Sequence, residues 1–241
     1  MSSKGRTKAA RKAPEADPSE FYRTPFGAVR VLFAAAADPS LGLVGQILRG
    51  FIAALQQGPV WELNAGEGDI IDHVQSLLGP VLWRTVELRP EAAALCAPHI
   101  ERGRPGSSLV TGDCFAELAR MRAAGERGAA MVGNPAFSLA LREVVEALPL
   151  CDYVCILQRA QWISDSRERR AVFRDNAPIE FRLGRLDFDG RGGDSTVYSW
   201  FLWPPELRGL RYAPLVVLEP PTGAETKGRQ PTTDRYQLTL L

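Results

Sequence analysis

An alternation of short apolar runs and amphipathic segments constrains the fold of this chain more than any other feature. Between residues 59 and 160, four apolar runs are each followed by a turn and a helical pattern, and a fifth apolar run ends the series. Because the connections are short, successive runs should lie in one sheet with helices packed across it. The runs are nearly continuous, which is typical of parallel strands covered on both faces. The sequence therefore predicts a mostly parallel sheet with helices on both sides.

Elements outside this series complete the predicted domain. Two helices are expected first, over 21–37 and 41–57, with Thr24 as the N-cap of the first helix and Pro25 at its first helical position. The expected strands of the alternating series are 59–65, 81–88, 108–113, 129–134 and 152–160. Three later apolar runs, separated by Gly-rich and Pro-rich turns, predict a hairpin and an antiparallel sheet edge; they are 179–188, 195–203 and 210–218.

Composition narrows the class of protein. The chain has 241 residues and is 45% hydrophobic, enough for one sizeable core. No apolar run reaches 18 residues, so we expect no membrane partner. The four cysteines form no C-x-x-C pair, and Cys151 and Cys155 flank a strand-like run. We therefore expect buried thiols, no metal site and a cytoplasmic protein, with no role for the two histidines.

The ends of the chain differ from its centre. Residues 1–19 are small, charged and Pro-containing, which predicts a disordered arm that is either a phosphate-contacting element or a solubilising tail. The first twelve residues contain no acidic side chain and five basic ones: Lys4, Arg6, Lys8, Arg11 and Lys12. We assign residues 20–220 to the folded domain and 221–241 to a C-terminal extension.

Polar residues stand where the first four predicted strands end. They are Glu62, Glu87, Asp113 and Asn134. In open parallel sheets, ligands bind beyond the carboxyl ends of the strands. Any one of these residues could be a turn or helix cap, and Asp113 directly precedes a helix. Four at one edge predict a binding site.

The turn after the first strand indicates what this site binds. Gly66 and Gly68 let the backbone approach a ligand closely, and the next helix offers free N–H groups. Glu87 lies nineteen residues after Gly68, where an acid is placed to hold two ribose hydroxyls. Asp113 is placed to accept from an adenine amino group. The pattern predicts a nucleoside-containing cofactor.

These motifs together resemble a known family. "GNPAF" resembles the [DNS]-P-P-[YFW] motif of amino-group methyltransferases that use S-adenosylmethionine, and "ELNAGEG", "VELRP" and "TGDCF" are similar to their glycine, ribose and adenine motifs. "FYRTPFGAVRVLF" resembles the Tyr/Thr-Pro segment of DNA N6-adenine methyltransferases, and residues 164–203 are similar to the late part of small phage-type members. The resemblance covers residues 21–203. It implies a Rossmann-like class I fold, α/β, with a mostly parallel seven-stranded sheet and an antiparallel C-terminal hairpin strand.

The resemblance also implies site residues. In that family, the Asn side chain and the carbonyl of the following Pro accept hydrogen bonds from the target NH₂, and the aromatic residue stacks on the target. Asn134, Pro135 and Phe137 are therefore the expected catalytic residues, with no metal. The second Pro of the motif is Ala136 here, which should make the loop less rigid. Expected contacts to S-adenosylmethionine come from Tyr22, Thr24, Pro25, Glu62, Asn64, Gly66, Gly68, Glu87, Leu88, Asp113, Cys114 and Asn134.

The implied reaction is methyl transfer to the N6 amino group of adenine in DNA, single-stranded or duplex with the adenine flipped out. RNA adenine and the glutamine amide of a protein present the same planar NH₂, and a catalytically silent binding module is a third reading. The Arg-rich stretch 159–185 favours nucleic acid, although a solvated helix face is its common alternative. Tyr22, Thr24 and Pro25 either close over the cofactor or cap the first helix. Trp162 lines the target pocket or belongs to the core.

Overall fold

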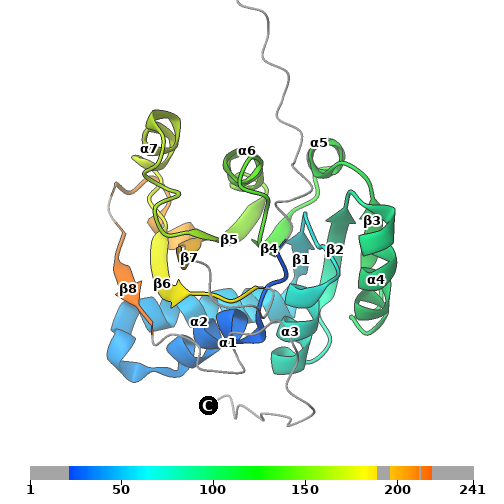
Figure 1. The fold of residues 1–241 in the computed structure, drawn as a ribbon, viewed down its shortest axis with the longest axis horizontal. Coiled ribbons are helices and arrows are strands. Elements are labelled where there is room, and N and C mark those ends of the chain that lie inside the picture. Colours follow the sequence, from blue (N-terminus) through cyan, green and yellow to red (C-terminus); the bar gives the residue numbers. More distant parts are fainter. Residues whose placement is uncertain (1–21, 189–195, 212, 219–241) are drawn as a thin grey trace, which may run out of the picture.

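The computed structural model describes residues 22–188, 196–211 and 213–218, so the predicted basic arm, the extension 221–241 and the turn 189–194 lie outside the described residues. One eight-stranded sheet carries helices on both faces, with strand order β3-β2-β1-β4-β5-β7-β6-β8 (Figure 1). The strands are β1 (Pro59–Glu62), β2 (Leu82–Glu87), β3 (Ser108–Thr111), β4 (Gly128–Gly133), β5 (Cys151–Arg159), β6 (Ile179–Arg185), β7 (Val197–Trp203) and β8 (Leu215–Val217). The predicted mixed α/β fold is confirmed.

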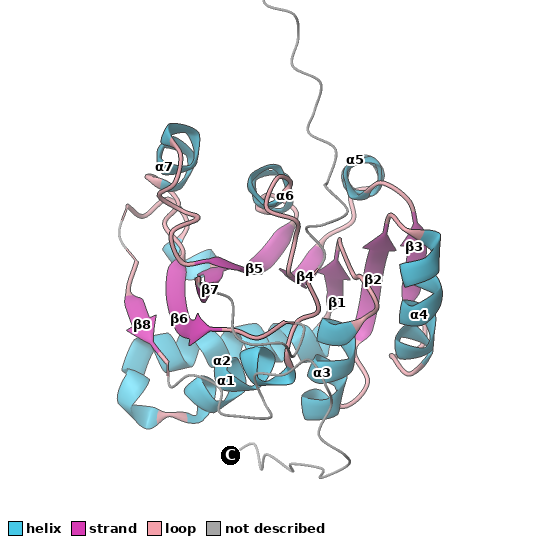
Figure 2. Ribbon diagram, viewed as in Figure 1, coloured by secondary structure: helices cyan, strands magenta, loops and turns pink. Residues whose placement is uncertain are grey.

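The helices divide into two layers around this sheet (Figure 2). One layer holds α1 (Phe26–Ala37), α2 (Gly42–Gln57), α3 (Asp69–Leu78) and α4 (Pro90–Glu101). The other holds α5 (Cys114–Ala123), α6 (Ala140–Ala147) and α7 (Arg167–Phe173). Short 3₁₀ turns stand at Pro39–Leu41 and Pro205–Leu207. The order along the chain explains the division, because the sheet is wound in both directions from β1.

The two-residue period of the strands builds a separate core on each face. Along β4, Ala130 and Val132 pack with the layer of α1 to α4, whereas Met131 between them packs with α5 to α7. Successive side chains of a strand point to opposite faces, so a strand that is apolar at every position serves both cores. This arrangement is what the continuous apolar runs predict.

The order in which the chain adds strands to the sheet reverses between β1 and β4: β2 and β3 lie on one side of β1, and β4 and β5 lie on the other. β1 pairs with both β2 and β4 in parallel, and the connections to β2 and β4 lead to opposite sides. Where the connections that follow two neighbouring parallel strands lead to opposite faces of the sheet, a crevice forms beyond the carboxyl ends of these strands. Many α/β proteins bind their ligands in this crevice. The fold therefore puts the predicted polar strand ends beside a natural binding position.

The C-terminal part forms the predicted antiparallel hairpin. β7 pairs antiparallel with both β5 and β6 and lies between them. All three later apolar runs form strands, and β8, parallel to β6, makes eight strands where the family resemblance implied seven. Burial explains the position of β7: it is buried at nearly every position, whereas burial alternates along β6. A strand covered on both faces belongs in the interior.

The first helix begins later than predicted, at Phe26, with Pro25 as its N-cap residue and no side-chain capping bond. Thr24 is therefore not the cap, because its hydroxyl is engaged with Asn134. Among the described residues, no single helix has the length and apolar character to cross a membrane, although α1 and the helical segment Pro39–Gln57, bent by 73°, would pass as a pair by length and composition. All four cysteines are buried.

Candidate functional site

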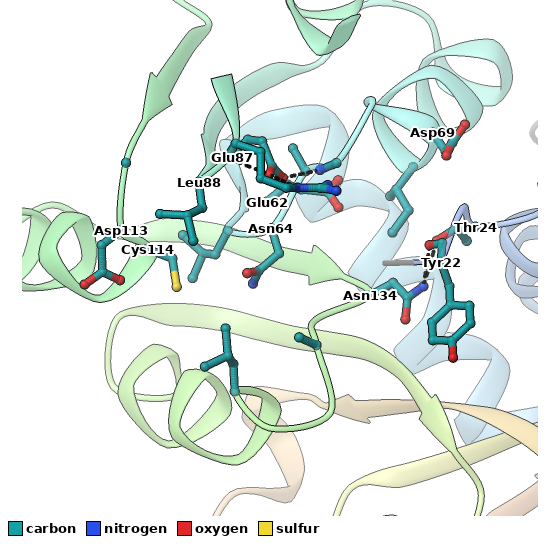
Figure 3. Close-up of a pocket in the computed structure, with 18 residues that line it drawn as sticks. Tyr22, Thr24, Glu62, Asn64, Asp69, Glu87, Leu88, Asp113, Cys114 and Asn134 are labelled. Atoms are coloured by element: carbon teal, nitrogen blue, oxygen red, sulfur yellow. Dashed lines mark hydrogen bonds and ion pairs between the residues drawn. The ribbon is translucent and has the colours of Figure 1, made fainter. Parts of the chain in front are cut away.

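A cavity of about 180 Å³ lies at the carboxyl ends of β1, β2 and β4 (Figure 3). It collects most of the residues predicted to bind the cofactor, although Pro25 and Gly68 do not line it. The predicted residues that line it are Tyr22, Thr24, Glu62, Asn64, Gly66, Glu87, Leu88, Asp113, Cys114 and Asn134. The sequence missed other lining residues, including Asp69, Arg89 and Leu139. Asp69 could have been found, because it follows the glycine turn directly.

Glu87 organises the glycine turn from the end of β2. One carboxylate oxygen accepts from the backbone N–H of Gly66 at 2.7 Å, and the other accepts from the backbone N–H and Nε of Arg89 at 3.0 and 2.9 Å. The Glu87 side chain is nearly fully buried. Hydrogen bonds to an ionised acceptor are stronger than neutral ones, so this carboxylate fixes the loop on which a ligand would rest.

The two glycines of this turn serve different purposes. Both have positive φ, +57° at Gly66 and +91° at Gly68, which favours glycine. A Cβ at Gly68 would also lie 2.9 Å from Cδ2 of His99 on α4. Gly68 therefore acts by letting α3 begin close against α4, which explains why it is needed although it does not line the cavity.

Two buried acids lie under the cavity. Burial raises the pKa of Glu62 well above its usual range, and the charges of Glu143, Asp69 and Glu87 add to the shift. Burial raises the pKa of Glu143 to about 8, against the opposing hydrogen bond that Asn64 Nδ2 donates to it. Oε2 of Glu62 has no hydrogen-bond partner among the described residues. A buried polar atom of this kind is costly to leave unpaired.

The segment before α1 crosses over this site and is fastened at two points. Arg23 Nη2 and Nε contact the Asp69 carboxylate at 2.6 and 3.1 Å. Asn134 Nδ2 donates to the backbone oxygen of Tyr22 at 3.3 Å and to the Thr24 hydroxyl at 3.2 Å. Figure 3 shows the Asn134 oxygen on the side away from these bonds. The segment thereby orients the key amide of the predicted catalytic motif.

Asp113 combines the two readings open for it. Its side chain accepts from the backbone N–H of Phe115 at 2.9 Å, which caps α5. It also lines the cavity together with its neighbour Cys114, whose thiol pKa is raised by burial. A capping carboxylate uses one oxygen for the helix, so the other stays available to a ligand.

A second cavity of about 140 Å³ adjoins the first and shares Tyr22 and Asn134 with it. Its remaining lining residues are Pro135, Phe137, Gln158, Arg159, Phe188 and Tyr198. Three of its aromatic rings form a chain, with centroids 5.4 Å apart from Tyr22 to Phe188 and 4.7 Å apart from Phe188 to Tyr198. The cavity is therefore a largely aromatic space that meets the first cavity at Asn134.

Two groups in the second cavity have partners that the sequence did not predict. The Pro135 carbonyl, expected to accept from the target, accepts from Gln158 Nε2 at 2.6 Å. The Phe137 ring, expected to stack on the target, has the Arg159 guanidinium 4.7 Å from its centroid and that of Arg169 at 5.6 Å. Trp162 is a core residue, fully buried against Phe173 and Phe201.

The Arg-rich stretch is partly neutralised by its own acids. Arg182 pairs with Glu180 at 2.8 Å, and Arg174 and Arg211 both pair with Asp175. Arg169, one of the two arginines beside Phe137, also pairs with Asp165, at 3.8 Å.

Within the described ranges, no group of three or more His, Cys, Asp or Glu residues is arranged to hold a metal ion.

Comparisons with known proteins bear on the fold. No family model and no curated protein sequence matches the chain. A proposed RNA methyltransferase from Pyrococcus horikoshii has a similar structure, with a TM-score of 0.52, 18% identity and coverage of 75% of this chain and 83% of that one. A proposed class I S-adenosylmethionine-dependent methyltransferase from Listeria monocytogenes also has a TM-score of 0.52, at 12% identity, with 78% and 67% covered. The chain has the fold of class I methyltransferases.

Proposed function

We propose that this protein transfers a methyl group from S-adenosylmethionine to the N6 amino group of adenine in DNA. The observation that carries the proposal is the position of Asn134, which lines both cavities while its amide is held by Tyr22 and Thr24. An acceptor oxygen fixed at the junction of a cavity beside the glycine turn and an aromatic cavity suits transfer from one ligand to another.

The first cavity fits the cofactor by the chemistry of its residues. Glu87 supports the ribose hydroxyls, and Asp113 the adenine amino group, beside the glycine turn. The unpaired Glu62 Oε2 offers an acceptor for the ammonium of the methionine part. Such an ammonium would favour the ionised carboxylate and reverse the effect of burial on its pKa.

The chain contributes orientation to the reaction. When bound, S-adenosylmethionine supplies a methyl group on a positively charged sulfur that is already a strong electrophile. Asn134 Oδ1 would accept a hydrogen bond from the NH₂ group of the target. This bond would orient the lone pair of the target nitrogen toward the methyl carbon. With the cofactor bound, the target nitrogen would take its methyl group, S-adenosylhomocysteine would be left, and the proton released from the nitrogen would pass to solvent. Placement alone accounts for a large part of such rate enhancements.

The second cavity supports a nucleobase as the target. Its aromatic rings provide stacking surfaces, which suits every base, and Arg159 and Arg169 place positive charge beside Phe137. Phe137 is then a stacking platform that shares its surface with these cations. The resemblance to phage-type enzymes favours DNA, while RNA adenine and a protein glutamine amide are outcomes that the experiment distinguishes.

The test is transfer of a labelled methyl group to single-stranded DNA, duplex DNA, RNA and a protein extract in parallel. We expect N6-methyladenine in DNA, and a loss of at least about 100-fold in rate for Asn134→Ala, because the target loses its orienting acceptor. The exposed Gln161→Ala serves as the control and should keep full activity. Label in RNA or protein alone would replace the proposed substrate, and no transfer with intact cofactor binding would indicate a silent binding module.

A further inference from the structure

Gln158 occupies an unusual position at the end of β5. Its side chain is 3% exposed, follows the buried run Tyr153 to Leu157 and lines the second cavity. Nε2 donates to the Pro135 carbonyl at 2.6 Å, and Oε1 has no partner among the described residues. A buried carbonyl oxygen without a donor costs free energy, so a residue of this kind needs a reason beyond packing.

The partners of Gln158 and Asn134 fix which end of each amide they engage. A backbone carbonyl can only accept, so the Pro135 carbonyl selects the NH₂ end of Gln158. The Tyr22 carbonyl selects the NH₂ end of Asn134 in the same way. Neither amide can rotate by 180° without setting two acceptors against each other. In both residues these bonds use the nitrogen of the amide and leave the oxygen, which in Gln158 is buried without a partner among the described residues.

We infer that Gln158 Oε1 and Asn134 Oδ1 accept the two protons of the target NH₂ group, with Gln158 taking the place that the family resemblance gives to the Pro135 carbonyl. The inference rests on the proposed function and names its substrate more closely. An NH₂ group has two protons to offer, whereas an N-methylated amino group has one and a carbonyl oxygen has none. The pair of acceptors should therefore select unmethylated adenine.

The test compares binding of short single-stranded DNA oligonucleotides with a single central adenine or N6-methyladenine, with S-adenosylhomocysteine in the cofactor site so that no turnover occurs. The wild-type protein should bind the adenine oligonucleotide at least about tenfold more tightly, as the loss of one hydrogen bond to a buried acceptor predicts. Equal dissociation constants in the wild type would overturn the inference without any variant.

Variants then assign the selectivity to Gln158. Gln158→Met keeps the volume of the side chain and removes both polar ends, so the adenine preference should fall to within about threefold. Gln158→Glu keeps an acceptor and loses the donor to Pro135, so it should retain more of the preference than the Met variant. The exposed Gln161→Met is the matched control and should leave the ratio unchanged. A residue that only supports Pro135 would lower both affinities and keep their ratio.

Methyl-transfer rates measured on the same adenine oligonucleotide distinguish a failure of the role given to Gln158 from a failure of the proposed function. If the wild type methylates adenine but Gln158→Met keeps its discrimination, the role of Gln158 is overturned and the proposed function stands. If the wild type methylates no DNA adenine, the proposed function is overturned and the inference falls with it. Thermal melting of each variant confirms that the comparison is made between folded proteins.

Discussion

The two cavities are built from the sequence in different ways. The first draws mainly on residues that follow strand ends, such as Glu62, Glu87 and Asp113, each inside a short motif. The second gathers single residues from separate segments, among them Tyr22, Gln158 and Tyr198. Strand ends of a parallel sheet converge by rule, whereas the walls of the second cavity meet only through the particular packing of this chain. The first cavity is thus a property of the fold, and the second is a property of this protein.

The largest expected effect concerns the buried acids beneath the first cavity. The pKa of Glu143 rises from its ordinary value of 4.5 to about 8 on folding, so the folded state keeps a proton that the unfolded state has lost. The contribution of Glu143 to stability should therefore be complete below about pH 4.5 and fall as pH rises toward about 8, by up to about 1.4 kcal/mol per pH unit. Denaturant unfolding at several pH values should show a shallower slope for Glu143→Gln. Equal slopes would contradict the assignment.

The second prediction concerns a substitution that should impair ligand binding in the first cavity alone. Glu87→Ala removes the proposed ribose acceptor and releases the Gly66 N–H, so the dissociation constant of S-adenosylmethionine should rise about 100-fold, or about 2.7 kcal/mol. Calorimetric titration measures this. Glu91→Ala, an exposed change on α4, is the control, and an unchanged affinity for Glu87→Ala would remove that residue from the cofactor site.

A smaller effect is expected at Thr24, and it would show whether this residue acts on cofactor binding in the first cavity or on the orientation of Asn134 between the two cavities. Thr24→Val keeps the shape of the side chain but removes the hydroxyl that receives Asn134 Nδ2 at 3.2 Å. We expect kcat to fall about tenfold while the dissociation constant of S-adenosylmethionine changes less than about threefold, because Asn134 loses orientation rather than contact. Thr24→Ser should restore the rate. A rise in the dissociation constant at constant kcat would assign Thr24 to cofactor binding instead.

The smallest effect concerns the departure from the family motif. Ala136→Pro rebuilds the second proline and should change unfolding free energy by less than about 1 kcal/mol, because proline reduces the freedom of the unfolded chain. We expect kcat to change by no more than about threefold, since the hydrogen-bonding groups of Asn134 and Gln158 are unaltered. A large gain in rate would show that loop rigidity limits the natural protein.

The sequence predicted the elements of the fold well, because apolar runs and helical periods are local patterns. It did not fix the position of β7 within the sheet, because the choice between the interior and the edge depends on packing against β5. In the site it found the acids at strand ends and missed Gln158, although a glutamine inside the apolar run of β5 is itself a signal of a buried polar role. It left Thr24 between a helix cap and a cofactor contact and missed its bond to Asn134, because that partner is 110 residues away.

That separation has a consequence for the order in which the protein becomes functional. The segment of Tyr22 to Thr24 is synthesised before every strand, yet its two bonds to Asn134 can form only after β4 has been made. Chains that end before β4 would leave this segment without its partner. Pairing over so long a stretch is an entropically demanding step. Activity should therefore appear late, only after the segment before α1 has met the end of β4.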